Sequence, residues 1–562
     1  MLTFSNNPKV AEQQMQAVIF YLTTFGYIDG DFDESERVFV SEYIEKLVAH
    51  RVKTGMPDAD DNLRVELTEK FTKHFHEEFE SIDLRIQELF TEAVSKDEDQ
   101  ATFVQSKLKL RCFEIFKSFD EGGQESLMET VDELLMADGV AHPAEVKFRA
   151  ELSALLETDL EVELVEEGES PPVSVTETVK LVAQQHTHPY FDQFEHHYSG
   201  DHSTLMKQLD ADRGLIQKTR QMFATQRAAG NGKLSGKQKV SDLAGEDQFL
   251  DGHVYVVPPK PGRTYDLTVL GDLHGCYSCL KSAVMQARFF EKVEAFQADP
   301  ENNPDPKLIF LGDYIDRGMF SLNGVLRSVL KMASTAPDHV FLLRGNHEFY
   351  IEYEGQVYGG VIPAEAINTL KPHVSTDVFK NYIDFFEDMP NMLLFGETLF
   401  VHGGIAKDQL LKERYVDLSS LNDPDIRFQM MWSDPSSADV IPAALQEQSS
   451  RFPFGRLQAA AFLQKIGCHT IVRGHEKVND GFARTYDDEN IVLITLFSAG
   501  GRDNDDLPPR SGYRRVTPMA MTMKIKDGEV EISPWKIDYE LYNNPDRNRF
   551  FQVAPSIEHI AT

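Results

Sequence analysis

Six short apolar runs between residues 265 and 504 constrain the fold of this chain more than any other feature. They are YDLTVLGDLHG (265–275), KLIFLGDYIDRG (307–318), HVFLLRGNHE (339–348), NMLLFGETLFVHGG (391–404), CHTIVRGHE (468–476) and IVLITLFSAGGRDN (491–504). Each run is rich in aliphatic residues and ends in a turn that carries Asp, His, Asn or Arg. Such runs are typical of buried strands, and in α/β sheets ligands bind where the carboxyl ends of the strands meet. We therefore expect the six loops to share one site.

These loops contain six side chains suited to holding metal ions. Carboxylate and amide oxygens mixed with imidazoles suit Mn, Fe or Zn better than a thiolate site would. One metal ion does not need so many donors, whereas two ions about 3.5–4 Å apart, bridged by one Asp and a hydroxide, use them all. The sequence therefore predicts a dinuclear site built from Asp272, His274, Asp313, Asn346, His402 and His475.

The motifs GDLHG, GDYIDRG, RGNHE, VHGG and VRGHE occur in this order between residues 271 and 476. Together they resemble the phosphoprotein phosphatase (PPP) family of the calcineurin-like metallophosphoesterase superfamily. The resemblance covers residues 265–505, under half of the chain. It implies an α+β catalytic domain with a central β-sandwich flanked by helices, where the strand pattern alone suggests a doubly wound sheet. It also implies hydrolysis of phosphomonoesters, typically of phosphoserine and phosphothreonine.

The resemblance also implies which residues hold each metal ion. One ion is held by Asp272, His274 and Asp313, with Asp313 as the bridge, and the second is completed by Asn346, His402 and His475. Two Mn²⁺ ions are expected, with Fe or Zn as alternatives. The reaction implied is direct attack on phosphorus by a hydroxide bound to both metals, without a phosphoenzyme.

Four further residues take roles from the same resemblance. His347 corresponds to the general acid that protonates the leaving alkoxide, and Asp316 would orient its imidazole. Arg317 and Arg344 correspond to phosphate clamps, because a planar guanidinium matches two phosphate oxygens. Trp432, in the segment MWSDP (431–435), matches a family segment that borders the site, and we interpret Asp434 as a residue that structures this loop.

The chain departs from the family pattern at two positions. The family has a third arginine shortly before Phe-Gly, where EQSSRFPFG (447–455) places Gln448, and Arg451 stands three residues later. The family also closes its site with a tyrosine, whereas SAGGRDN (498–504) places Arg502 there. We expect Arg451 or Arg502 to supply the missing positive charge.

Two cysteines directly after the first metal loop form a second candidate metal pair. Cys276 and Cys279 have no matching partners, because the chain has no second C-x-x-C and Cys112 and Cys468 are isolated. We place them in the first turn of a helix, where the helix dipole lowers a thiol pKa. Buried packing is the favoured role, with redox inhibition of the metal centre as the alternative.

Residues 8–157 have apolar residues at three- and four-residue spacing, which predicts an all-helical N-terminal domain. The domain contains an internal repeat that aligns FGYIDGDFDESERVF (25–39) with LLMADGVAHPAEVKF (134–148). Each copy reads as a helix, an Asp-Gly turn and a second helix. The repeat resembles the Asp-Gly turn of TerB-like helical domains.

The repeated turn is rich in acids but does not fit an EF-hand. Counted from Asp29, Glu34 and Val40 stand at the loop positions that require Gly and Glu. We interpret the two Asp-Gly turns, Asp29–Gly30 and Asp138–Gly139, as helix connections with N-capping carboxylates. A metal site in these turns is the alternative.

The region between the helical domain and the apolar runs has three distinct parts. Residues 157–178 are strongly acidic and contain Pro-Pro, which predicts a linker or hinge. Five histidines between His186 and His202 match no strict metal template, so packing and surface roles are favoured. The polar, Gly-rich segment 227–239 predicts a mobile loop.

Four parts of the chain follow from these patterns. Residues 1–157 are the helical domain, 158–249 an acidic linker with a mixed helical regulatory segment, 250–545 the metallophosphoesterase domain, and 546–562 a C-terminal tail. Within the third part, MAMTMKIKDGEVEISPWKIDYELY (519–542) predicts a hairpin that turns at Asp527–Gly528 and completes the sheet.

Charge and composition narrow the partners and the compartment. With 56 basic and 91 acidic residues, the net charge of −35 argues against nucleic-acid binding. No apolar run approaches the ~20 residues of a membrane span. Only four cysteines in 562 residues favour a reducing compartment, so a cytoplasmic location is expected.

The function expected from all of these features is that of a metal-dependent protein serine/threonine phosphatase. Its substrate would be a phosphoprotein or phosphopeptide, and the helical domain would dock a regulatory partner. The alternative is a nucleotide phosphohydrolase of the diadenosine-tetraphosphate hydrolase type, which shares the metal motifs. A non-catalytic scaffold would have lost metal ligands, and none is lost.

Overall fold

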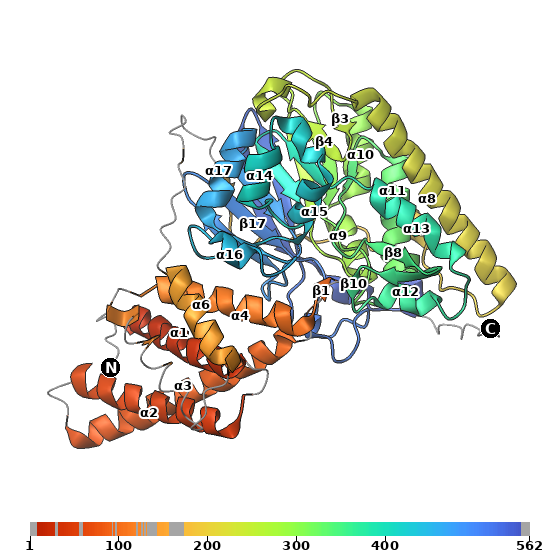
Figure 1. Cartoon of the computed structure of the whole chain (residues 1–562). Coiled ribbons are helices and arrows are strands. Elements are labelled where there is room, and N and C mark those ends of the chain that lie inside the picture. The colour runs from red at the N-terminus through yellow and green to blue at the C-terminus, as the bar shows by residue number, and fades with distance from the viewer. Residues whose placement is uncertain are drawn as a thin grey trace. The chain divides into compact units, whose positions relative to one another are not determined.

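The computed structural model of the chain forms two compact units (Figure 1). One comprises Met1–Glu161 and Ser436–Pro453, and the other Val162–Pro435 and Phe454–Thr562. We call them the helical unit and the sandwich unit. The residues that the structure describes are 8–28, 32–55, 60–90, 92, 94–95, 98–119, 122–124, 127–128, 131, 143–156, 164 and 173–551, with the side chains of 8–10 and 143–146 left out.

The helical unit contains the predicted N-terminal helices. They are α1 (Pro8–Gly26), α2 (Glu34–Gly55), α3 (Asp61–Leu89), α4 (Gln100–Lys117) and α6 (Pro143–Leu156), with a short strand β1 (Val94–Ser95). Their apolar faces pack into one core that includes Tyr21, Phe25, Phe103 and Phe113, all at most 1% exposed. Helix α16 (Ala443–Gln446), far along the sequence, adds Leu445 to this core.

The acidic segment before α2 caps that helix, as we interpreted it. The backbone amide of Glu36 donates to Asp33 Oδ1, and the amide of Asp33 donates to Glu36 Oε2, both at 2.9 Å. These paired bonds form a capping box, which satisfies amide groups at the start of a helix. The repeated turns Asp29–Gly30 and Asp138–Gly139 lie outside the described residues, so the alternative of a metal site there stays a prediction, as does the TerB-like resemblance.

The sandwich unit contains two large sheets. The six-stranded sheet has the order β2 (Val173–Val175), β19 (Glu529–Lys536), β18 (Met519–Lys526), β5 (Tyr265–Leu270), β6 (Asp305–Phe310) and β7 (Val340–Leu342). The seven-stranded sheet has the order β16 (Phe482–Asp487), β17 (Val492–Leu496), β15 (Thr470–Arg473), β12 (Thr398–Val401), β11 (Met392–Phe395), β4 (Val254–Val257) and β3 (Phe249–Asp251). The β-sandwich expected from the family resemblance is therefore present, and the doubly wound sheet is not.

Strand residues alternate between two cores, which explains why these strands read as continuous apolar runs. In β11, Leu393 and Phe395 belong to the core shared with the six-stranded sheet. Their neighbours Met392 and Leu394 belong to a separate core on the other face. Because successive side chains of a strand point to opposite faces, both faces of this sheet are buried.

Helices cover both sheets, as Figure 1 shows. The core of the six-stranded sheet includes side chains from α8 (His202–Gly230), α9 (Tyr277–Gln286), α11 (Arg327–Thr335), α12 (Glu365–Leu370) and α13 (Asp377–Asp388), and α10 (Phe289–Ala298) follows α9. The outer core of the seven-stranded sheet includes side chains from α14 (Asp408–Arg414), α15 (Pro424–Trp432) and α17 (Arg456–Ile466).

Short elements complete the sandwich unit. They are α7 (Pro189–Asp192), the hairpin β8 (Tyr350–Tyr353) and β9 (Gln356–Gly359), β10 (Val361–Ile362), β13 (Asp434–Pro435), β14 (Pro453–Phe454), the 3₁₀ segments at Val240–Leu243, Leu418–Asn422, Gly512–Arg515, Tyr539–Tyr542 and Arg549–Phe551, and a π-helical turn at Ser321–Leu326. The predicted C-terminal hairpin is present as β18 and β19, with Lys526 paired to Glu529.

The stretch 158–249, predicted as an acidic linker with a mixed helical regulatory segment, packs with the elements that follow it, and its regulatory role stays a prediction. Most of this stretch belongs to the sandwich unit, because β2 extends its sheet and α8 packs along α11 and α13. Arg327 Nε lies 2.7 Å from Asp212 Oδ1, and Lys281 pairs with Glu195, all four side chains being buried. Buried charges require close partners, so these pairs hold the stretch firmly to α9 and α11.

The Gly-rich segment 227–239 is also more ordered than expected. Helix α8 continues to Gly230, and Leu234 beyond it is fully buried. Asp251 accepts hydrogen bonds from the amides of Gly232 and Leu234 at 3.1 and 2.9 Å. The predicted mobile loop is therefore a packed turn.

The predicted packing role of the histidine cluster is confirmed for several members. His197 Nε2 lies 2.9 Å from the carbonyl of Phe550, and the ring of His188 stacks on Phe290 at 4.2 Å. Residues 157–163 and 165–172 of the predicted linker (157–178) and residues 552–562 of the C-terminal tail lie outside the described residues. Among described residues, no helix combines the length and the apolar character needed to cross a bilayer.

Candidate active site

The strand ends bring five predicted metal ligands to one edge of the sandwich. Strands β5, β6 and β7 run parallel, so the loops with Asp272, Asp313 and Asn346 leave the six-stranded sheet on the same side. Strands β12 and β15 are also parallel, and His402 and His475 follow them. This is the convergence that the apolar runs predicted.

The backbone is strained at this edge. His274, Asp313, Asp316, Arg317 and His475 have φ values of 43°, 53°, 67°, 64° and 69°. A residue with a Cβ atom in this left-handed region costs about 1 kcal/mol or more. Such strain persists only where the surroundings enforce it, and it gathers at functional sites.

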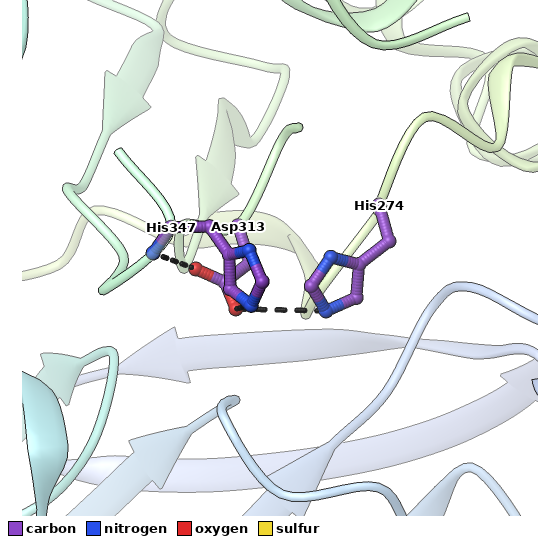
Figure 2. Close-up of side chains that lie close together, drawn as sticks. All are labelled: His274, Asp313 and His347. Atoms are coloured by element: carbon purple, nitrogen blue, oxygen red, sulfur yellow. Dashed lines mark hydrogen bonds and ion pairs between the residues drawn. The ribbon is translucent and has the colours of Figure 1, made fainter. Parts of the chain in front are cut away.

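Asp313 lies between two groups of imidazoles. Its Oδ2 is 3.5 Å from His274 Nε2 and 4.0 Å from His347 Nε2. Figure 2 shows both rings turned toward this carboxylate. Each of the three side chains offers one ligand atom within 4.8 Å of the others, so the group has room for a metal ion.

The other carboxylate oxygen of Asp313 faces the second group. His402 Nε2 lies 3.4 Å from Asp313 Oδ1, and Asp313, His402 and His475 again have ligand atoms within 4.8 Å of one another. Asn346 Oδ1 lies 2.9 Å from His402 Nε2 and 3.1 Å from His475 Nδ1. One aspartate thus joins two donor groups, which is the geometry expected of a bridging ligand.

Asp272 provides the strongest local indication that a cation fits here. Its Oδ1 accepts a hydrogen bond from the amide of His475 at 2.9 Å, whereas its fully buried Oδ2 has no hydrogen-bond partner among the described residues. Burial and the charge of Asp313 raise the pKa of Asp272 to about 7. A buried, unsatisfied carboxylate oxygen is costly unless a cation lies against it.

The histidines have charge states consistent with metal binding. Burial lowers the pKa of His274 to about 3, so its imidazole is neutral at physiological pH, as a metal ligand must be. The Nδ1 atoms of His274 and His402 lie 3.0 Å from the carbonyls of Ile315 and Leu311. If these nitrogens carry the proton, both Nε2 atoms are free to face the centre, an arrangement common in metal-binding histidines. The donor set therefore fits divalent metal ions.

His347 and Asp316 form the predicted acid pair. His347 Nδ1 lies 2.7 Å from Asp316 Oδ2, and Asp316 Oδ1 accepts a hydrogen bond from the amide of Ala366 at 2.8 Å. Burial lowers the pKa of His347, but the charges of Asp313 and Asp316 outweigh burial and raise it above the ordinary value. This shift favours the protonated imidazole, whose Nε2 lies on the side that faces Asp313.

The four predicted phosphate-binding arginines have different surroundings. Arg317 Nη1 lies 3.0 Å from Glu365, and Arg344 Nη2 lies 2.6 Å from Glu387. Arg502 is exposed, and its carbonyl accepts a hydrogen bond from Arg514.

The fourth, Arg451, belongs to the helical unit rather than to the sandwich. Its Nη1 lies 3.3 Å from Glu92. The segment EQSSRFPFG, where the family carries its third arginine, contributes residues 447–453 to this unit. The segment that lacks the family's third arginine is thus also a segment that packs in the helical unit instead of the sandwich unit.

Tyr513 is a candidate site residue that sequence reasoning missed. Its hydroxyl lies 3.4 Å from His274 Nε2, and its ring lies 5.1 Å from that of His274. The loop that carries Tyr513 is folded against residues 502–508 by Arg514, which donates to the carbonyls of Pro508, Leu507 and Arg502. No motif marks Tyr513, because only the folding of the loop brings it to the site.

Glu348 is a second residue whose role was not predicted, although it closes the RGNHE motif. It is fully buried and accepts hydrogen bonds from the amides of Asp313, Tyr314 and Gly345 at 2.8–3.0 Å. Burial and the charge of Asp313 raise its pKa to about 7. These bonds lock the loops after β6 and β7 together.

Asp434 has the structuring role that we expected. Its Oδ1 lies 2.8 Å from Arg473 Nη2, and both side chains are buried. Arg473 also donates to the carbonyl of Gly403. Trp432 is buried with its ring 6.1 Å from that of His475, so this segment borders the site.

Cys276 and Cys279, which follow the loop with Asp272 and His274, are buried and lie in no candidate metal site among the described residues. Cys276 precedes α9, Cys279 lies in its first turn, and neither belongs to a metal-sized cluster of described residues. Burial raises the pKa of the Cys276 thiol well above its ordinary value. The expected lowering by the helix dipole is therefore wrong for Cys276, because desolvation outweighs it.

Comparison with known proteins gives one family match. Residues 265–479 match the family model described as calcineurin-like phosphoesterase. A similar solved structure is that of a protein serine/threonine phosphatase from Saccharomyces cerevisiae, described as similar to human phosphatase PP5. The two share 18% identity with a TM-score of 0.36, covering 58% of this chain and 89% of the yeast chain. This likeness is too distant to carry an argument.

Proposed function

From the calcineurin-like phosphoesterase domain that residues 265–479 form, we propose that this chain is a metal-dependent protein serine/threonine phosphatase. The observation that supports this most is the bridging position of Asp313, which joins two buried groups of donors beside a paired acid, His347. A buried site of this composition suits hydrolysis of a phosphomonoester, because both the charge of the phosphoryl group and the leaving oxygen need stabilisation.

We assign the metal ligands as the sequence predicted. Asp272, His274 and Asp313 would hold one divalent ion, and Asp313, Asn346, His402 and His475 the other. Two bound ions, with Mn²⁺ expected, would supply an activated water molecule and neutralise charge on the phosphoryl oxygens. The unsatisfied Oδ2 of Asp272 supports this assignment.

His347 would deliver the proton to the leaving oxygen. Asp316 holds the imidazole through Nδ1, which leaves Nε2 on the side of the metal-ligand cluster. Alkoxides of serine and threonine are poor leaving groups, so their departure requires a proton donor. The raised pKa of His347 favours the protonated form that this role requires.

Arg317 and Tyr513 are the polar groups that we assign to the phosphoryl oxygens. Burial of the Arg317 guanidinium lowers its pKa, but the neighbouring groups, Tyr513 and Glu365 among them, outweigh burial and raise it. Arg317 would exchange part of its contact with Glu365 for the substrate. The roles predicted for Arg344, Arg451 and Arg502 stay predictions.

A substrate comparison tests the proposed function. The purified full-length chain is stripped with a chelator, reloaded separately with Mn²⁺, Fe²⁺ or Zn²⁺, and assayed on a phosphoserine peptide, on p-nitrophenyl phosphate and on diadenosine tetraphosphate. We expect metal-dependent release of phosphate from the first two. Cleavage of the dinucleotide with no peptide hydrolysis would favour the nucleotide phosphohydrolase. Inactivity on all three under every metal would leave the non-catalytic scaffold.

The helical unit is proposed to dock a regulatory partner. The supporting observation is that residues 436–453 leave the sandwich fold and add Ile441 and Leu445 to the core of the helical unit. A loop of the catalytic sequence thus depends on the helical unit for its structure. Binding of a partner to that unit would be expected to change phosphopeptide turnover.

A further inference from the structure

A cavity of about 260 Å³ in the sandwich unit extends to Asn346, one of the assigned metal ligands. Aromatic and apolar side chains form part of its wall, with Phe349, Phe428, Met431 and Trp432 among them. The charged residues at the cavity are Arg344, Glu387, Asp425 and Arg427. A group bound in this cavity would therefore lie next to the reacting phosphoryl group.

Arg427 is a cation without an acidic partner in this cavity. Its Nη1 donates to Asn391 Oδ1 at 2.9 Å and its Nε to the carbonyl of Asn422 at 3.2 Å, and both acceptors are neutral. Within the described part of the chain, no carboxylate lies within ion-pair distance of Arg427. Burial and the charge of Arg344 lower the Arg427 pKa to about 10, so the guanidinium stays charged at neutral pH.

The acids at the cavity are already paired with other arginines. Glu387 lies 2.6 Å from Arg344 Nη2, and Asp425 lies 2.6 Å from Arg414 Nη1. Nearby, His253 has its pKa lowered to about 4, by burial first and then by the charge of Arg427, so it is neutral at physiological pH. Arg427 is thus the arginine of this group that has no carboxylate within ion-pair distance among the described residues, whereas Arg344 and Arg414 each have one or more.

We propose that this cavity is a subsite for an anionic side chain of the substrate, held by Arg427 close to the phosphorylated residue. The proposal rests on the proposed phosphatase function and names a substrate class within it, phosphopeptides with an acidic residue near the phosphate. A half-buried guanidinium without an anion is unfavourable, and an incoming carboxylate forms charge-assisted hydrogen bonds to it.

The cavity wall strengthens this interaction. The guanidinium of Arg344 lies over the ring of Phe349 at 5.6 Å, and the rings of Phe428 and Trp432 lie 5.9 Å apart. These side chains reduce the access of water, and a charge interacts more strongly where water is excluded. A second phosphate on the substrate has the same chemistry as a carboxylate, so the two sources of the anion are separated by experiment.

Matched phosphopeptides test the subsite. One phosphoserine peptide is prepared with glutamine at the flanking positions, one with glutamate at each position in turn within three residues, and one with a second phosphoserine. We expect wild-type kcat/KM to rise about tenfold for glutamate at one position, the scale of one charge-assisted contact. Arg427→Gln should lose this preference, and Arg427→Lys should retain part of it.

Two controls separate the subsite from general effects. Arg414→Gln removes an exposed arginine that pairs with Asp425 and should retain the preference for glutamate. Turnover of p-nitrophenyl phosphate, which has no flanking residues, should stay within twofold of wild type in every variant. A larger fall for Arg427→Gln would mean that the substitution damages the fold or the metal centre, and a role confined to the subsite would be overturned.

The outcomes distinguish the subsite from the proposed function. If wild type hydrolyses all the peptides equally, or if Arg427→Gln keeps the preference, the subsite is wrong and the phosphatase function stands. A preference for the second phosphate alone, lost in Arg427→Gln, would support the anion subsite but assign it to phosphate. If p-nitrophenyl phosphate is hydrolysed and no peptide is, the protein phosphatase function fails and the subsite with it.

Discussion

Asp83 in the helical unit and Asp272 in the sandwich unit are both buried carboxylates, 4% and 0% exposed, but their surroundings differ. Both oxygens of Asp83 have partners, because Tyr27, Arg37 and Gln87 all donate to them. Asp272 has one oxygen without a hydrogen-bond partner among the described residues. The first acid is arranged to stabilise a fold, and the second is arranged to contact a cation.

Backbone geometry shows the same contrast. Among described residues, the non-glycine positions with positive φ all lie in the sandwich unit, and five of them lie in the loops that carry the candidate metal ligands. The acid network of the helical unit is built on ordinary helical backbone in α2 and α3. A satisfied buried acid therefore indicates structure, whereas an unsatisfied one on strained backbone indicates a site.

The largest effects should come from exchanging one acid in each unit. Asp313→Asn should lower kcat for p-nitrophenyl phosphate by about 10²-fold or more, since it removes the bridging charge, with little loss of stability measured in chelator. Asp83→Asn should leave kcat unchanged and lower the free energy of unfolding by about 2 kcal/mol, because Arg37 loses its partner. Steady-state kinetics and thermal unfolding of both variants measure these two effects. If Asp83→Asn lost activity at a temperature where it is folded, the contrast between a structural and a catalytic acid would be wrong.

The next largest effect is expected on stability, at a residue close to the sequence boundary between the two units. Leu445 lies in the sandwich half of the sequence but is 2% exposed within the core of the helical unit. Leu445→Ala should therefore destabilise the helical unit by about 2–4 kcal/mol. Hydrogen exchange should show faster exchange in α1 to α4, with β5 and β6 unaffected. Leu463→Ala, in the outer core of the seven-stranded sheet, should instead speed exchange in β11, β12 and β15 and leave α1 to α4 unaffected.

Replacing Asp316 should lower the rate of the chemical step more than it weakens substrate binding. Asp316→Asn leaves His347 less well oriented and less basic, so kcat for a phosphoserine peptide should fall by about 10²-fold. p-Nitrophenyl phosphate has a good leaving group and needs less help from an acid, so its kcat should fall much less. An equal fall for both substrates would show that Asp316 maintains the site rather than supporting proton transfer.

Tyr513 and the two predicted arginines should have smaller effects. Tyr513→Phe should raise KM for p-nitrophenyl phosphate by about fivefold, roughly the value of one ordinary hydrogen bond. The prediction that Arg451 or Arg502 supplies positive charge survives if either alanine variant raises KM more than about threefold. If neither does, and Tyr513→Phe does, the missing family contact is made by the tyrosine alone.

The smallest effect is expected at the cysteines. Cys276 and Cys279 are fully buried, and burial raises the pKa of the Cys276 thiol, so mild oxidant should leave activity nearly unchanged. The same treatment of Cys276→Ser is the control. Oxidant inhibition that reductant reverses in wild type, and that the variant lacks, would restore the redox alternative.

Much of the candidate site could be read from local motifs. The six predicted ligands and the His347–Asp316 pair lie in turns directly after strands, where sequence position determines spatial position. Residues that arrive by long-range packing could not be read in this way. Tyr513 reaches His274 only because its loop folds back. Arg427 becomes a candidate binding residue only because three separate stretches of the chain form the cavity that it lines.

The sequence by itself determined the helical character of α1, α2, α3, α4 and α6, the strands that precede the site loops and the identity of the clustered donors. These depend on short-range periodicity and on motifs whose spacing is local. Only the tertiary structure decided that the stretch up to residue 249 belongs largely to the sandwich, that residues 436–453 belong to the helical unit, and that Asp83 is satisfied while Asp272 is not. Those outcomes depend on which distant groups meet in a buried environment, and a buried charge is stable only with the partners that the complete fold brings to it.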